Sequence, residues 1–150
     1  MTAAEFLYVT LIDAPREVVW RALTLPEFTK QYWHETEVQS DWKVGSTVRF
    51  MVGDEVGCEG EVFICRPYEE LSYGWRFPRN PECAAEAPSR VTFLLENVGG
   101  ATKLTLRHDQ FTSDESPTYK MVAGGWPYVL AGLKTLCEKG KTPDFSAHYG

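Results

Sequence analysis

The chain has 150 residues, of which 43% are hydrophobic and 24% are charged, and its formal net charge is −6. This length suits one domain, for which we expect a core over residues 5–140 and a C-terminal tail over residues 141–150. The negative charge and the lack of a lysine or arginine run argue against nucleic acid as a partner, because phosphate binding requires clustered cations.

The first predicted element is a strand over residues 5–13, which are rich in β-branched and aromatic side chains. Both of its alternating faces are apolar: Leu7, Val9 and Leu11 lie opposite Phe6, Tyr8 and Ile12. We therefore expect this strand to be covered on both sides, which favours a homodimer or another surface contact.

Two short helices should follow the first strand. Pro15 suits the start of a helix, and the spacing of Thr24 and Glu27 is that of a capping box before a second helix over residues 25–32. Next come Trp33, His34, Glu35 and Glu37, which we interpret as a solvated strand edge. A metal site is not favoured there, since alternation sends His34 away from both glutamates.

Residues 34–109 change to a period of two, which indicates antiparallel strands with one apolar face. Residues 97–100 (NVGG) have the composition of a hairpin turn. Residues 78–88 are rich in proline and charge and should form an exposed loop. We expect all four cysteines to be reduced and mostly buried, with Cys83 in this loop the most exposed.

The last predicted element is a long amphipathic helix over residues 118–140, ended by Gly140. Within it, Gly124, Gly125 and Pro127 weaken the helix and predict an opening beside Trp126. Because the helix needs an apolar surface and the sheet needs a cover, the two should pack together in an α+β fold.

Four segments, APREVVWRALTLPE (14–27), GEVFICRPYEELSYGW (60–75), SRVTFLLENVGGATKLTLRH (89–108) and GGWPYVLAGLKTLCEKG (124–140), carry a family resemblance. In this order they resemble the START-like superfamily (SRPBCC), in the branch similar to the C-terminal domain of the activator of the Hsp90 ATPase. The resemblance implies a helix-grip fold: a curved antiparallel sheet of six to seven strands wrapped on a long C-terminal helix, with two short helices after the first strand. It also implies a cavity between helix and sheet. Relatives often carry an acid where this chain has Ile64, so an acidic group there is not carried over.

We predict that the cavity binds a small hydrophobic molecule, either a lipid, an aromatic compound or a polyketide-like one. The residues expected to bind it are Tyr8, Phe50, Tyr73, Trp75, Phe93, His108, Met121, Trp126 and Leu130. Among these, His108 is the candidate polar anchor at the mouth of the pocket. The alternatives are that the apolar members only fill a core, and that His108 is a strand-end histidine satisfied by a carbonyl or a water.

Two other functions stay open. One is a stress- or chaperone-related interaction protein with an Hsp90-type chaperone as its partner. The other is a cyclase or dehydratase using His108, Tyr8 and Tyr73, although the sequence holds no standard catalytic motif and we predict no catalytic residue, metal or other cofactor. No apolar run of about 20 residues and no signal-peptide pattern occur, so we expect a cytoplasmic protein that does not insert into membranes.

Overall fold

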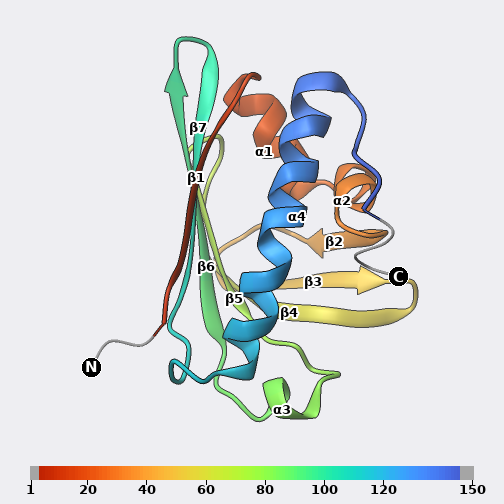
Figure 1. Ribbon diagram of the computed structural model, residues 1–150, viewed down its shortest axis with the longest axis vertical. Coiled ribbons are helices and arrows are strands. Elements are labelled where there is room, and N and C mark those ends of the chain that lie inside the picture. The colour runs from red at the N-terminus through yellow and green to blue at the C-terminus, as the bar shows by residue number, and fades with distance from the viewer. Residues whose placement is uncertain (1–3, 146–150) are drawn as a thin grey trace.

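The computed structural model describes residues 4–145, so the last five residues of the expected tail lie outside it. Seven antiparallel strands form one sheet in the order β1-β7-β6-β5-β4-β3-β2, and helix α4 lies across one face of it (Figure 1). This confirms the predicted α+β helix-grip fold. The strands are β1 Phe6–Ile12, β2 Thr36–Ser40, β3 Thr47–Val52, β4 Glu55–Arg66, β5 Glu70–Trp75, β6 Ser89–Val98 and β7 Ala101–Asp109. The helices are α1 Arg16–Thr24, α2 Pro26–Tyr32, α3 Pro81–Ala84 and α4 Pro117–Lys139.

The sheet curls around α4, since β2 and β3 run across the view of Figure 1 while β1 and β7 run along it. Register shifts in the β3–β4 pair, between Phe50 and Met51, and in the β4–β5 pair supply this curvature, because a bulge bends and twists its strand. Phe50 is buried, but Val52 is 41% exposed.

Helix α2 begins without the predicted capping box. Its N-cap is Leu25, and no side chain caps it. Thr24 is still the last residue of α1, where its hydroxyl donates to the Trp20 carbonyl at 2.8 Å. A threonine inside a helix commonly bonds the carbonyl four residues back, and this one is therefore not available to α2.

The predicted loop over residues 78–88 contains the short helix α3, whose N-cap is Asn80. Cys83 lies in α3 and is 1% exposed, so the expectation that it is the most exposed cysteine is wrong. The helical turn directs Cys83 toward α4, where its Sγ donates to Met121 Sδ at 3.5 Å. All four cysteines are free thiols.

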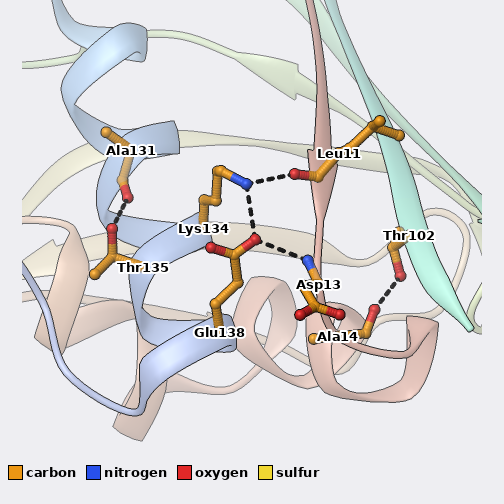
Figure 2. A network of polar contacts seen from close by, with 8 residues as sticks. All are labelled: Leu11, Asp13, Ala14, Thr102, Ala131, Lys134, Thr135 and Glu138. Carbon is orange, nitrogen blue, oxygen red and sulfur yellow. Dashed lines mark hydrogen bonds and ion pairs between the residues drawn. The ribbon is translucent and has the colours of Figure 1, made fainter.

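The C-terminal half of α4 is fastened to β1 by two charged side chains (Figure 2). Lys134 Nζ donates to the Leu11 carbonyl at 2.5 Å, and the Glu138 carboxylate accepts the Asp13 N–H at 2.8 Å. The two side chains also pair with each other at 2.7 Å. The Asp13 N–H and then Lys134 hold the pKa of the Glu138 carboxyl below its ordinary value.

The outer face of β1 is not covered by any part of residues 4–145. Leu7, Val9 and Leu11 are 51%, 52% and 59% exposed, while Ile12 on the inner face is fully buried. The prediction of coverage on both sides is wrong for the single chain, because β1 is an edge strand and α4 packs against only one face of the sheet. No helix within residues 4–145 is both long and apolar enough to cross a membrane.

Two glycines of α4 should respond oppositely to an added methyl group. A Cβ at Gly132 would lie 3.0 Å from Tyr32 Cβ and 3.1 Å from its carbonyl oxygen, whereas a Cβ at Gly124 meets nothing within 4 Å. We expect Gly124→Ala to raise the free energy of unfolding by about 0.5–1 kcal/mol through helix propensity. Gly132→Ala should lower it by about 1–3 kcal/mol through overpacking. Urea denaturation measures both, and a shift in the same direction for the two variants would contradict the described contact between α2 and α4.

Candidate functional site

The space between α4 and the sheet holds a cluster of aromatic rings. Trp75, at the end of β5, contacts Trp126 of α4 with ring centroids 5.3 Å apart and Phe50 of β3 at 5.4 Å. Trp33, just after α2, lies 4.9 Å from Phe50 and 5.4 Å from Trp126. Four separate elements therefore bring their rings to one place.

His108 lies at the centre of a buried hydrogen-bond chain. Trp126 Nε1 donates to His108 Nδ1 at 3.0 Å, and an indole nitrogen can only donate. His108 Nδ1 is thus the acceptor, and the neutral ring carries its proton on Nε2, 2.7 Å from Ser89 Oγ. The Ser89 hydroxyl in turn donates to the Trp75 carbonyl at 3.3 Å. Each donor has one acceptor, so the tautomer and the direction of the chain are fixed.

Burial explains the charge state of this histidine. His108 has no exposed surface, and its ring stacks on Phe111 at 4.6 Å. Loss of hydration lowers the pKa of His108 to about 3, which keeps the ring neutral at physiological pH. Burial also raises the pKa of the nearby core groups Tyr73 and Cys58, so neither ionises readily.

Two adjoining pockets open beside the aromatic cluster. The first, of about 130 Å³, lies against α4 and is lined by Trp33, Trp75, Phe77, Met121, Val122, Gly125, Trp126 and Val129. The second, of about 150 Å³, lies against β3 and β4 and shares Trp33, Trp75 and Phe77 with the first. We call them the helix-side pocket and the strand-side pocket. The helix-side pocket lies where Gly124, Gly125 and Pro127 predict an opening, although α4 continues through Pro127.

Two hollows of at least twice the volume of either pocket lie elsewhere. One, of about 300 Å³, is on the outer face of the sheet among charged and polar side chains that include Arg90, Arg107 and Asp109. The other, of about 430 Å³, lies between α1, α2 and the end of α4, where Arg21 and Gln31 line it. Neither contains any of the nine residues predicted to bind a ligand.

The structure places the predicted site residues in three groups. Trp75, Trp126 and Met121 line the helix-side pocket, and Phe50 and Trp75 line the strand-side pocket. Buried in the core behind these walls are Tyr73, Phe93, Leu130 and His108. Tyr8 lies apart on β1, where it stacks on Phe6 at 6.3 Å.

Trp33 is the main wall residue that the sequence analysis missed. We expected it at a solvated strand edge, but β2 begins only at Thr36 and Trp33 is the C-cap of α2. His34 and Glu35 take positive φ angles of 41° and 57°, which reverse the chain and leave Trp33 packed inward. The available signal in the sequence was a large apolar side chain directly after the second predicted helix, because such a side chain is more often buried than solvated. Among residues 4–145 no three His, Cys, Asp or Glu side chains gather as metal ligands would.

The depressed pKa of His108 predicts a pH dependence of stability. Between the unfolded pKa of 6.5 and the folded value of about 3, the unfolded chain binds a proton that the folded chain does not, so acid favours unfolding. We expect the free energy of unfolding to fall by about 2 kcal/mol between about pH 7.5 and pH 5, above the range of most carboxylates.

Urea denaturation at several pH values across this range measures the predicted fall in the free energy of unfolding. His108→Gln should remove this pH dependence, and His34→Gln, which alters an exposed histidine, should keep it. An unchanged slope in His108→Gln would contradict the assignment.

Comparisons with known proteins identify the family. The family model described as "Activator of Hsp90 ATPase homolog 1-like protein" matches residues 13–138, and a search among curated proteins finds no match. A solved Mesorhizobium loti protein is similar at 26% identity and a TM-score of 0.73, over 89% of this chain and 96% of its own. The Aha1 dimer of Colwellia psychrerythraea has 20% identity and a TM-score of 0.73, over 92% and 98%. An HSP90 activator of Plasmodium falciparum has 23% identity and a TM-score of 0.68, over 81% and 86%. In agreement with the START-like resemblance, the chain belongs to the family of activator of Hsp90 ATPase homolog 1-like proteins.

Proposed function

We propose that the protein binds a small aromatic molecule in the helix-side pocket, between α4 and the sheet. The observation that carries this proposal is the pocket's lining, which consists of aromatic and aliphatic side chains and one glycine. Small-molecule sites are concave and mainly apolar, with few polar groups. Ring faces and edges on several sides favour a flat ligand that can stack or pack edge to face.

The volume narrows the class of ligand. About 130 Å³ is close to the size of an apolar cavity that holds a benzene ring, roughly 150 Å³, and is smaller than the roughly 300–1,000 Å³ of pockets for drug-sized ligands. Lipids and polyketide-like molecules are too large for this space as it stands. A ligand of one ring, or of two rings reaching past Trp33 into the strand-side pocket, fits it best.

Binding has more support than proton-transfer catalysis. Both ring nitrogens of His108 are engaged, and the ring lies behind the pocket wall. His108 therefore acts on the pocket by holding Trp126 in place. Burial raises the pKa of Tyr73 and so disfavours its ionisation, and Tyr8 lies away from both pockets.

Two adjacent glycines of α4 offer a direct test. A Cβ at Gly125 or at Gly124 meets no atom within 4 Å, but only Gly125 lines the helix-side pocket. We expect Gly125→Leu to fill the pocket and weaken binding of fluorobenzene at least tenfold, measured by fluorine NMR titration. Gly124→Leu changes helix propensity equally and should bind as the wild type does.

Two results would contradict the proposal. One is wild-type protein that binds no member of a panel of one-ring and two-ring aromatics. The other is an equal loss of binding in Gly124→Leu and Gly125→Leu, since the ligand would then occupy a different place.

A second proposal concerns association of the chain with itself. Leu7, Val9 and Leu11 form an apolar stripe on the outer face of β1, and cross-strand register places Lys103 and Arg107 of β7 beside it. An apolar centre with a charged rim is the usual anatomy of a protein interface. One structure with this fold is described as a dimer, which supports the proposal that two copies pack these faces together.

Sedimentation or light scattering over a range of concentrations tests the dimer. We expect Val9→Lys to convert dimer to monomer, because it buries an unpaired charge at the centre of the stripe. Val44→Lys makes the same substitution at a loop position that is 70% exposed and lies outside the stripe, and it should leave the dimer intact.

A wild-type chain that stays monomeric at every concentration would contradict the dimer. The outer face of β1 would then be open to a different protein. An Hsp90-type chaperone would be the next partner to test, by the rate of its ATPase with wild-type and Val9→Lys protein.

A further inference from the structure

The Trp33 ring lies between the two pockets. Its centroid is 4.9 Å from that of Phe50, which lines only the strand-side pocket, and 5.4 Å from that of Trp126, which lines only the helix-side pocket. It also stacks on Trp75 at 6.0 Å, with the two ring planes 14° apart. Because Trp75 is only 4% exposed and Trp33 is partly buried, Trp75 forms the floor of this region and the Trp33 indole lies above it.

Three residues line both pockets, and Trp33 is the one placed to separate them. Phe77 contacts Trp75 edge to face at 5.5 Å, and within residues 4–145 it makes no ring contact with Phe50 or Trp126. Trp75 belongs to the buried core, where it also contacts the His108 ring at 5.5 Å. Trp33 alone therefore lies on the pocket side of the floor and touches a ring specific to each pocket.

The turn after α2 holds Trp33 in this position. Its backbone N–H donates to the Thr29 carbonyl at 2.8 Å, and its carbonyl accepts the Thr36 N–H at 2.9 Å. His34 and Glu35, with their positive φ angles, reverse the chain directly after it. The Trp33 indole itself makes no hydrogen bond to any group of residues 4–145. A smaller side chain there would thus remove the ring without leaving a buried partner unpaired.

We infer that Trp33 is the specificity-determining residue of the aromatic site, because its indole keeps the two pockets separate and so excludes planar ligands of three fused rings. This inference rests on the proposed ligand site. Each pocket has about the volume of an apolar cavity that holds one benzene ring, roughly 150 Å³, so neither alone holds three fused rings. Without the indole, the space from Trp126 to Phe50 would be continuous over the face of Trp75. A planar ligand would then stack on Trp75 where the Trp33 indole now lies.

Dibenzofuran and fluorobenzene are the probes for this inference, since the first is a neutral planar molecule of three fused rings and the second is a single ring. Ligand-observed NMR titration measures the affinity of each. We expect Trp33→Ala to raise the dibenzofuran-to-fluorobenzene affinity ratio by about tenfold or more, because truncation of a packed ring leaves a cavity that an apolar ligand can fill. Trp33→Leu should raise the ratio less.

Phe6→Ala is the control variant. Phe6 is also a partly buried ring packed against the core, but it lines neither pocket. Its truncation should therefore leave the affinity ratio as it is in the wild type. Thermal unfolding adds a second readout: dibenzofuran should raise the melting temperature of Trp33→Ala and not that of Phe6→Ala, because a ligand stabilises the folded state that binds it.

The outcomes separate the inference from the proposed function. If fluorobenzene binds the wild type and Trp33→Ala but the affinity ratio is the same in both, the inference is wrong while the aromatic site stands. An equal rise of the ratio in Phe6→Ala would also overturn it, since general loosening would then explain the change. If Trp33→Ala does not fold, an unchanged ratio in Trp33→Leu decides against the inference. Failure of fluorobenzene to bind the wild type would overturn the site and the inference together.

Discussion

The buried hydrogen-bond chain from Trp126 through His108 and Ser89 to the Trp75 carbonyl fixes how α4 sits on the sheet. Every member lies in an apolar interior, where a lost partner leaves a desolvated polar group. Rotation or sliding of α4 would break the Trp126 bond and leave a buried donor and a buried acceptor unpaired. The chain joins α4 to β7, β6 and β5, and so gives a mostly apolar interface one specific alignment.

The pockets follow from that alignment. Because His108 holds the Trp126 ring at one edge, and Trp33 enters from the turn after α2, the rings meet at centroid distances of 5 to 6 Å. The space left between them and α4 is the helix-side pocket. Gly125 keeps it open, since any side chain at this position of the helix would extend into it.

The periodic parts of the fold could be predicted from the sequence. Apolar spacing indicated α4, and Gly140 indicated its end, where this glycine takes the left-handed conformation with φ 72°. It also indicated the β6–β7 hairpin, where Gly99 and Gly100 have positive φ angles. Most of the predicted wall residues do lie between α4 and the sheet, because strand alternation fixes which face each side chain takes.

Features that depend on a break in periodicity could not be predicted. Trp33 turns in because of two positive φ angles. Cys83 is buried because α3 forms within a segment whose composition is typical of a loop. Each requires a local conformation that tertiary packing selects. The hydrogen bonds to both ring nitrogens of His108 likewise depend on Ser89 and Trp126, which are distant from it in sequence.

The contacts of Lys134 and Glu138 with β1 bear on how the protein avoids aggregation. An open sheet edge presents unpaired backbone groups on which a foreign strand can add. Here the Leu11 carbonyl and the Asp13 N–H are already bonded to side chains of α4 (Figure 2). An incoming strand would have to displace an ion pair as well as both hydrogen bonds. Because these α4 side chains oppose strand addition at this end of β1, no charged residue on β1 is needed there to prevent it. The outward-facing positions of β1 can therefore be leucine and valine.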